Sequence, residues 1–195
     1  MNKVPDVIVS VIIPNYNRTT ALSKAINSVV EQSIKDIEVL IIDDYSEKIQ
    51  EITEIVNSFN DGRLKLITNN HKVGGAKARN IGIIKAKGYY IAFLDSDDTW
   101  REDKLEKQLD LIRKHPNSLV YCQSKVFNKA NTLILPVREI QVGENLSEYL
   151  FLRSGLIQTS SILIEKDVAL KSLFNETYQR HQDYDFLFQL EGKIP

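Results

Sequence analysis

A short acidic run, Asp95-Ser96-Asp97-Asp98, directly follows the apolar segment Tyr89–Leu94. Three carboxylates within four residues repel one another in a partly desolvated site unless protons or a cation neutralise them. Such hard oxygen ligands favour Mg²⁺ or Mn²⁺, and proteins usually hold Mg²⁺ with one or two carboxylates together with substrate phosphates and water. The run therefore predicts a divalent metal site, and capping of the next helix by Asp97 or Asp98 is the structural alternative.

Polar residues also follow the three preceding strand candidates. Asn15–Arg18 follows the first, Asp43–Asp44 ends the second, and His71–Gly75 lies beyond the third. Ligands in open α/β sheets bind at the carboxyl ends of the strands, where these residues are expected to meet. Taken singly, the aspartates could form a turn and Tyr16 could be an ordinary loop aromatic. Their joint placement favours one ligand site.

Arg79 lies early in a predicted helix, in the string GGAKARN. A cation there could meet a diphosphate, and a solvated arginine on a helix face is the alternative. The glycines do not form a phosphate-binding P-loop, because the string lacks the Gly-Lys-Ser/Thr ending. No Gly-x-Gly-x-x-Gly follows the first strand either, so the sequence carries neither of these nucleotide-binding fingerprints.

The elements that must position these residues alternate short β-branched runs with helical patterns over the first hundred residues. Helices are indicated by apolar residues at helical spacing within residues 22–30 and 49–59, and by the small-residue segment 75–86. A fourth helix carries Leu105, Leu109 and Ile112. The strands are predicted at Val7–Pro14, Ile37–Asp43, Leu64–Asn69 and Tyr89–Leu94. The order βαβαβαβ predicts an α/β fold with a mostly parallel sheet covered by helices.

The pattern becomes less regular after His115-Pro116. Strands are predicted at Leu119–Phe127, Thr132–Leu135 and Ser160–Ile164, with a polar turn at 128–131, a short helix at 146–152 and a final helix at Gln182–Glu191. The single cysteine, Cys122, cannot form an internal disulfide. Its apolar neighbours predict a place in a buried strand and not a role as a nucleophile.

Composition limits the classes of protein that fit. The 195 residues suit one compact unit, and the formal charge of -1, from 25 basic and 26 acidic residues, provides no basic footprint for nucleic acid. The N-terminal apolar run is broken by Ser10, and no segment reaches the roughly 18 apolar residues that a spanning helix needs. No signal-peptide cleavage site follows that run. We therefore expect a cytoplasmic protein with at most peripheral membrane contact.

Four strings together resemble the family 2 glycosyltransferases: VSVIIPNYNR, IEVLIIDDYS, GGAKARNIGIIKAKGYYIAFLDSDD and RHQDYDFLFQL. The resemblance implies a GT-A fold, with a Rossmann-like, mostly parallel central sheet flanked by helices, over one catalytic domain at 1–195. It implies a donor-binding half at 1–98 and an acceptor-binding half at 99–195. Relatives usually continue beyond Pro195, so we expect the acceptor half to be truncated at its C-terminus.

In this resemblance the LDSDD string looks like the family's DxD motif. It implies that Asp95 contacts the donor ribose and that Asp97, with Asp98, reaches a Mn²⁺ or Mg²⁺ ion bridging the diphosphate. Uracil is the commonest base in such pockets, so a UDP-sugar is the expected donor. The remaining donor-site residues implied are Pro14 and Tyr16 lining the base pocket, Asp44 bonded to the base, Arg79 near the nucleotide, and Asn17, Arg18 and Ser96 beside them.

The late HQDYD string looks like the family's Glu-Asp motif, in which the aspartate is the catalytic base. The resemblance assigns this role to Asp183 in an inverting reaction, and N-capping of the last helix is the structural alternative. Gln182 stands where relatives usually have Glu, which removes one charge. The Gln-x-x-Arg-Trp motif of processive members is absent, so transfer of a single sugar to a glycan or lipid-linked acceptor is expected, in bacterial surface polysaccharide synthesis.

Three other functions fit parts of the sequence. A sugar nucleotidyltransferase usually carries a Gly-rich, Arg-containing loop after its first strand, where this chain has Asn15–Arg18. A non-catalytic receiver-like module also binds Mg²⁺ with an acidic cluster, but it would have no use for the HQDYD string. The third is a glycosyltransferase-like protein that binds nucleotide without turnover, an alternative that Gln182 keeps open.

Overall fold

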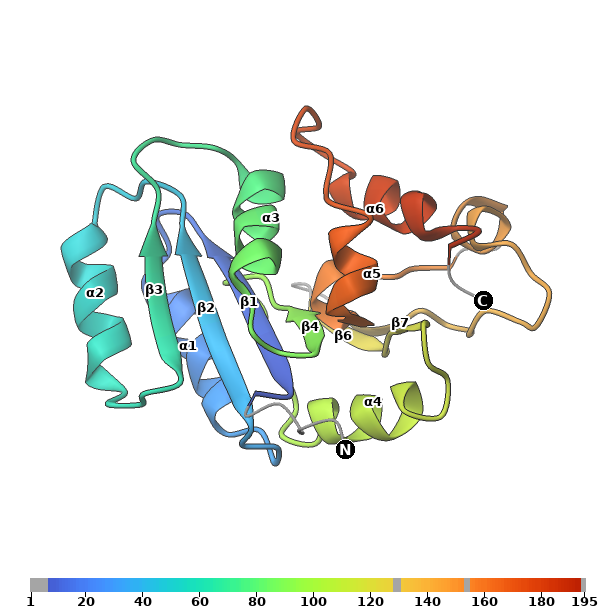
Figure 1. The fold of residues 1–195 in the computed structure, drawn as a ribbon, viewed down its shortest axis with the longest axis horizontal. Helices are drawn as coiled ribbons and strands as arrows, with labels where there is room; N and C mark the ends of the chain where they lie inside the picture. The colour runs from blue at the N-terminus through green and yellow to red at the C-terminus, as the bar shows by residue number, and fades with distance from the viewer. Residues whose placement is uncertain (1–6, 128–130, 153–154, 194–195) are drawn as a thin grey trace.

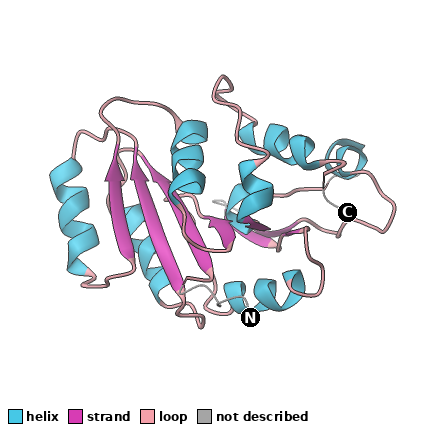
Figure 2. Cartoon of the chain, viewed as in Figure 1, coloured by secondary structure: helices cyan, strands magenta, loops and turns pink. Residues whose placement is uncertain are grey.

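The structure, a computed structural model, describes residues 7–127, 131–152 and 155–193. Within them a central sheet has the strand order β3-β2-β1-β4-β8-β5, and a separate hairpin consists of β6 and β7. Figure 1 shows helices on both sides of the sheet, and Figure 2 shows the same view by type of element. The predicted α/β architecture is therefore confirmed.

The elements have the following bounds. The strands are β1 Val9–Asn15, β2 Ile37–Asp43, β3 Leu64–Thr68, β4 Tyr90–Phe93, β5 Leu119–Val120, β6 Ser124–Phe127, β7 Thr132–Leu135 and β8 Leu163–Glu165. The α-helices are α1 Thr20–Val30, α2 Ile49–Ser58, α3 Gly75–Lys85, α4 Lys104–Ile112, α5 Lys166–Leu170 and α6 Gln182–Leu190. A π-helical segment, η1, spans Glu148–Leu152, and a 3₁₀ turn, η2, spans Thr159–Ser161.

The sheet is mostly parallel because β1 pairs in parallel with both β2 and β4, and β2 pairs in parallel with β3. β8 runs antiparallel to its neighbours β4 and β5. Every residue of β2 is buried, as expected for an interior parallel strand covered on both faces. The carboxyl ends of β1 to β4 therefore lie along one edge, which is uppermost in Figure 1.

Two apolar layers hold the helices against the sheet. Alternate residues of β1 point to opposite faces, so Val11 and Ile13 join one cluster while Ile12 joins the other. The first cluster contains buried residues of α1, α2 and α4, and the second contains those of α3, α5 and α6. The site at the carboxyl edge is thus supported by a sheet whose two faces are both covered by helices.

Helix α3 packs unusually close to the sheet. A Cβ atom added at Gly82 would lie 2.4 Å from Ile12 Cγ2, so only glycine fits at this crossing. Ala76 and Ala78 are buried on the same helix, as the small-residue pattern predicted. Gly74, the N-cap of this helix, has a φ of 87°, a backbone conformation that other residues rarely adopt. This packing fixes the place of Arg79 above the sheet edge.

The second half corrects two predictions. The predicted strand Leu119–Phe127 is two strands, because β5 joins the central sheet through β8 whereas β6 pairs with β7. Cys122 lies in the connection between them and is half-buried, so its placement in a buried strand was wrong. Burial raises the pKa of its thiol, and the nearby Lys104 cation works against that rise.

Other elements of this half lie near their predicted places. The strand predicted at Ser160–Ile164 is β8, which begins later because η2 occupies residues 159–161. The predicted helix at 146–152 contains η1, and α6 confirms the final helix. Helix α5 had not been predicted. Most of the predicted turn at 128–131 lies outside the described residues.

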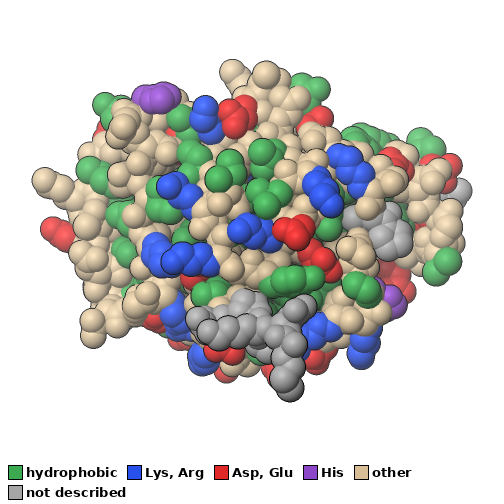
Figure 3. Space-filling model, viewed as in Figure 1, with side chains coloured by type: hydrophobic (Ala, Val, Ile, Leu, Met, Phe, Trp, Pro, Cys, Tyr) green, Lys and Arg blue, Asp and Glu red, His purple; other side chains and the backbone are tan. Residues whose placement is uncertain are grey.

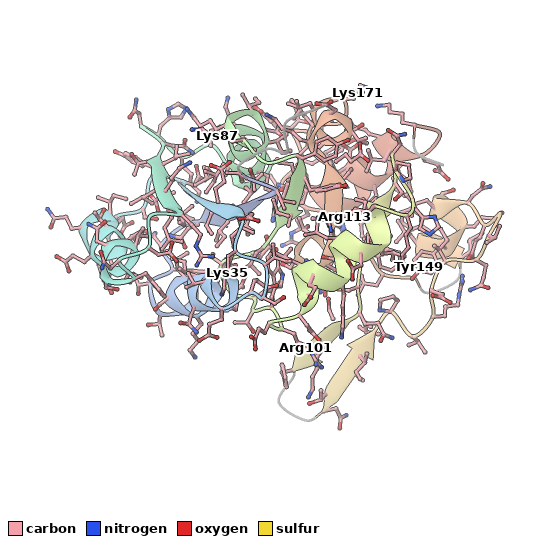
Figure 4. The ribbon with its side chains drawn as sticks, turned by 60° about the horizontal axis from the view of Figure 1, so that its bottom comes forward. Lys35, Lys87, Arg101, Arg113, Tyr149 and Lys171 are labelled. Atoms are coloured by element: carbon pink, nitrogen blue, oxygen red, sulfur yellow. The ribbon has the colours of Figure 1, made fainter. Side chains whose placement is uncertain are left out.

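The surface carries both charges. Lys, Arg, Asp and Glu side chains are interspersed over the face in Figure 3. Figure 4 shows α4 from below, with Arg101 before its start and Arg113 at its end. Among the described residues, no helix has both the length and the apolar character needed to cross a membrane.

Candidate active site

The loops that follow β1 and β4 meet at the carboxyl edge of the sheet. Arg18 Nη1 donates a hydrogen bond to Ser96 Oγ at 3.3 Å, and Arg18 Nη2 lies 2.9 Å from Asp97 Oδ2. Both charged side chains are about half exposed, at 48% and 50%. Exposed pairs of this kind contribute little stability, so Arg18 and Asp97 are free to turn toward a ligand at small energetic cost.

Arg79 lies at the centre of the site and is largely buried, with 11% of its side chain exposed. Its Nη2 lies 2.5 Å from Asp95 Oδ1, and its Nη1 donates to Gln182 Oε1 at 3.2 Å. The Nε atom is buried without a hydrogen-bond partner among the described residues. One guanidinium thus joins α3, the end of β4 and the start of α6, and its buried Nε–H remains unused among the described residues.

The acidic run has neutralising partners within the protein. Arg79 pairs with Asp95, and Arg18 pairs with Asp97. Asp98 accepts a hydrogen bond from Ser160 Oγ at 2.6 Å. Partial burial of its carboxyl group raises the pKa of Asp98, the Ser160 bond lowers it, and the neighbouring carboxylates add to the rise. The repulsion predicted from the sequence is therefore relieved largely by two arginines.

A metal held by protein groups alone is not built here. In the described ranges no three His, Cys, Asp or Glu side chains gather in a way that could hold an ion. The capping alternative is also wrong, because α4 begins at Lys104 with Asp103 as its N-cap. Asp97 and Asp98 remain hard oxygen donors that one or more substrate phosphates could complete, as Mg²⁺ sites commonly require.

Asp43 and Asp44 both bind the protein backbone, as the turn alternative anticipated. Asp43 accepts hydrogen bonds from Ser46 N–H and Oγ at 2.9 and 2.6 Å. Asp44 accepts from the N–H groups of Val73 and Gly74 at 2.7 and 2.8 Å. Asp44 therefore holds the loop that precedes α3 in place. Four lone-pair positions on a carboxylate leave it able to accept a further bond.

The predicted base-pocket residues lie around the end of β1. Pro14 is half-buried in the strand, and Tyr16 is 39% exposed. Lys72 Nζ lies 3.8 Å from the centre of the Tyr16 ring, a cation–π contact between the loops after β1 and β3. The backbone of Asn17 donates to Ser46 Oγ, and its side-chain oxygen accepts from Glu47 N–H. Asn17 thus ties two of these loops together.

Asp183 lies in the first turn of α6. The N-cap of that helix is His181, so the capping alternative for Asp183 is wrong. Its half-buried carboxylate accepts no hydrogen bond from the described residues. By contrast, Asp185 accepts from Gln189 Nε2 at 2.7 Å. Of these two aspartates, Asp183 has its carboxylate available, and the Gln182–Arg79 contact holds its helix near Asp95.

Two residues of the site are not indicated by the sequence. Lys72 lies in the polar loop after β3, but no sequence signal predicts its contact with Tyr16. Ser160 is separated from Asp95 and Asp98 by 65 and 62 positions. Its role depends on the antiparallel placement of β8, which a single sequence does not reveal.

Comparison with known proteins gives a family. The model of glycosyl transferase family 2 matches residues 10–178. The amylovoran biosynthesis glycosyltransferase AmsB of Erwinia amylovora is 36% identical over 95% of this chain and 64% of its own length. The UDP-Glc:alpha-D-GlcNAc-diphosphoundecaprenol beta-1,3-glucosyltransferase WfgD of Escherichia coli is 40% identical over 63% of this chain and 48% of its own. The chain thus spans about half to two thirds of the length of these relatives.

Solved structures agree on the fold. The crystal structure of S. aureus TarS 1–349 in complex with UDP-GlcNAc has a TM-score of 0.75 at 21% identity, covering 94% of this chain and 53% of that one. The mannosyltransferase PcManGT from Pyrobaculum calidifontis, in complex with GDP-Man and Mn²⁺, has a TM-score of 0.68 at 17% identity over 94% and 54%. The predicted GT-A fold is confirmed. Nucleotidyltransferase and receiver-like alternatives find no support in these matches.

Proposed function

The chain belongs to glycosyl transferase family 2, and from this membership we propose that the protein transfers a single sugar from a nucleotide-diphosphate sugar to an acceptor hydroxyl. One observation carries the proposal. Arg79 contacts both Asp95, at the end of β4, and Gln182, directly before Asp183. Asp95, which is suited to bind the donor ribose, and helix α6, which carries the carboxylate of Asp183, thereby both contact Arg79.

The donor lies along the carboxyl edge of the sheet in this proposal. Its diphosphate lies between Arg18 and Arg79, because guanidinium groups bind phosphates through charge-assisted hydrogen bonds. The ribose contacts Asp95, while Ser96, which is fully buried, supports the site by accepting the hydrogen bond from Arg18. Four residues of the loops after β1 and β2 surround the base: Pro14, Tyr16, Asn17 and Asp44. A UDP-sugar is the proposed donor, supported by the UDP-Glc in the name of WfgD and by the UDP-GlcNAc bound to TarS.

A divalent metal fits the acidic run as a partner of the donor. Asp97 is exposed, and Asp98 Oδ1 has no hydrogen-bond partner among the described residues, so both offer oxygen atoms to Mn²⁺ or Mg²⁺. The Mn²⁺ in the PcManGT complex supports this choice. When bound, the ion would offset negative charge on the departing diphosphate.

Asp183 acts as the general base of an inverting displacement. Its carboxylate removes the proton of the acceptor hydroxyl while the hydroxyl oxygen forms a bond to the anomeric carbon. The bond from that carbon to the diphosphate oxygen breaks, and the electron pair leaves with the nucleotide diphosphate. General-base assistance of this kind contributes about 10² to 10⁴ in rate. The unoccupied carboxylate of Asp183 supports the role better than Asp185, which is engaged with Gln189.

The acceptor is proposed to be a growing surface polysaccharide or a lipid-linked glycan. The names of AmsB and WfgD support this class, since one refers to amylovoran biosynthesis and the other to a diphosphoundecaprenol acceptor. The reaction would then take place at the cytoplasmic face of a membrane, through peripheral contact. The proposed reaction involves no nucleic acid.

Thermal unfolding with nucleotides tests the proposal. The protein is heated with UDP, GDP, CDP or dTDP, each with Mn²⁺ or with EDTA, and UMP serves as the control that lacks a diphosphate. A ligand at a hundred times its dissociation constant adds about 2.7 kcal/mol, which raises the midpoint by roughly 5 to 10 °C for a domain of this size. A shift with UDP and Mn²⁺ that UMP does not produce supports the donor site. Equal midpoints for all nucleotides would contradict it.

A further inference from the structure

Ser160 uses its hydroxyl group on both ends of the acidic run. Its Oγ accepts a hydrogen bond from the backbone N–H of Asp95 at 3.0 Å and donates one to Asp98 Oδ2 at 2.6 Å. The residue is 8% exposed, so little water competes for these bonds. One hydroxyl therefore fixes where the run begins and how the Asp98 carboxylate is turned.

The run is closed on itself and held from two sides. The N–H of Asp98 donates to the carbonyl of Asp95 at 3.0 Å, which makes a tight turn. Trp100 Nε1 donates to the carbonyl of Ser160 at 2.8 Å, and the Trp100 backbone N–H donates to Ser28 Oγ on α1 at 3.1 Å. The backbone and the side chain of Ser160 thus both form hydrogen bonds with the segment from Asp95 to Trp100.

Ser160 itself stands on a rigid support. β8 pairs antiparallel with β4, with Ala92 opposite Leu163, so the residues just before β8 lie beside the carboxyl end of β4. Gln108 Nε2 on α4 donates to the carbonyl of Ser161 at 2.8 Å. The 3₁₀ turn that carries Ser160 is therefore tied to both the sheet and α4.

We infer that Ser160 is a positioning residue for metal-dependent donor binding, an inference that rests on the function proposed above. The bond to Oδ2 leaves Asp98 Oδ1 as the carboxylate oxygen without a partner among the described residues. The bond to Asp95 N–H sets the backbone from which Asp95, Asp97 and Asp98 project. Preorganised oxygens bind a cation and diphosphate without first losing conformational freedom. A residue of the second half of the chain thereby completes the donor site of the first half.

Ser161 provides a matched control. It is also buried in the same turn, at 2% exposed, and its Oγ donates to the carbonyl of Gln158 at 2.6 Å and not to the acidic run. Ser160→Ala and Ser161→Ala each remove one buried hydroxyl group. Ser160→Thr keeps the hydroxyl. A purely structural role would make the two alanine variants alike, whereas a positioning role separates them.

The test is titration calorimetry of UDP binding with Mn²⁺ and with EDTA, on the full chain, beside circular dichroism melts. We expect Ser160→Ala to weaken Mn²⁺-dependent UDP binding about tenfold, since a hydrogen bond to a charged group is lost. With EDTA its affinity should change far less. Ser161→Ala and Ser160→Thr should bind within about threefold of the wild type. If Ser160→Ala does not fold, Ser160→Cys, with a side chain of similar size and a weak donor, takes its place with the same expectation.

The outcomes are distinct. A Ser160→Ala protein that binds UDP with Mn²⁺ as tightly as Ser161→Ala would overturn the positioning role while leaving the donor site intact. A loss that is equal with Mn²⁺ and with EDTA would also overturn it, because the effect would then be structural. A wild-type protein that binds no nucleotide under either condition would overturn the proposed function and the inference with it.

Discussion

Gln182 Oε1 accepts a hydrogen bond from Arg79 Nη1 at 3.2 Å, although the two residues are 103 positions apart in the chain. The residue directly before Asp183 therefore contacts the guanidinium that pairs with Asp95. Because a glutamine amide is neutral, the described ion pairs of Arg79 involve one carboxylate, that of Asp95, and its buried Nε–H has no acceptor among the described residues. This arrangement suits a site that attracts a diphosphate.

Gln182→Glu should weaken binding of nucleotide diphosphate about three- to tenfold. The new carboxylate would lie near Arg79 and compete with the diphosphate for the positive charge of the guanidinium. Two opposite charges in contact near a protein surface attract each other by a few kcal/mol at most. The measurement is titration calorimetry with UDP and Mn²⁺. Gln182→Met, which removes the hydrogen bond without adding charge, separates the two effects. Equal or tighter binding in the Glu variant would refute the charge argument.

Asp183→Asn should reduce sugar transfer by about 10² to 10⁴ while donor binding stays near the wild-type value. The amide keeps the shape of the carboxylate but cannot accept the acceptor's proton. Transfer of radiolabelled sugar and calorimetry with UDP measure the two properties separately. Asp185→Asn, which alters the neighbouring aspartate bonded to Gln189, is the matched control. Near-normal transfer by Asp183→Asn would exclude this residue as the base.

Asp97→Ala should abolish the advantage that Mn²⁺ gives to UDP binding. The change removes an exposed oxygen donor and frees Arg18, so binding in EDTA should be unchanged or slightly stronger. Calorimetry with and without Mn²⁺ checks this. Asp103→Ala provides the comparison, because the described ion pairs of Asp103 are with Arg101 and Lys107 and not with Arg18 or Arg79. A metal advantage that persists in Asp97→Ala would remove Asp97 from the metal site.

The fold of the first half, residues 7–98, followed from the sequence because its signals are local. Buried β-branched runs and apolar residues at helical spacing predicted β1 to β4 and α1 to α3 to within about two residues at most ends. The glycine and alanine residues of α3 predicted its close approach, which the Gly82–Ile12 contact explains. The gathering of polar loops at one edge follows from parallel strands alone.

The fold of the second half was harder to predict because its strand pairing is non-local. β5 and β6 lie within one predicted strand, Leu119–Phe127, and only the partner strands β8 and β7 decide which of them joins the central sheet. The same holds for side chains. The Arg18–Asp97 and Ser160–Asp98 contacts join residues far apart in the chain, and no spacing rule predicts them. The sequence predicted that a cation neutralises the acidic run, but it did not predict that Arg18 and Arg79 supply part of that positive charge.

Lys104, the first residue of α4, is a buried cation that the proposed reaction does not use. Its Nζ donates to Gln108 Oε1 at 2.7 Å and lies 3.9 Å from the centre of the Trp100 ring. Burial lowers the pKa of Lys104 to about 8, and the charge of nearby Cys122 works against this. The unfolded chain keeps a pKa near 10.5. Between these values the unfolded state binds more protons, so the free energy of unfolding rises with pH.

Lys104→Met should remove this rise. Urea unfolding at pH 7.5 and pH 10 gives the stability difference between the Met variant and the wild type, in which other titrating groups cancel. From pH 7.5 to pH 10, the free energy of unfolding of the wild type should rise relative to that of the Met variant by on the order of 1 to 3 kcal/mol. The same pair in a Cys122→Ser background removes the thiol as the cause. A difference that is the same at both pH values would mean that Lys104 keeps an ordinary pKa in the folded protein, and its burial against Trp100 would then carry no cost in protonation.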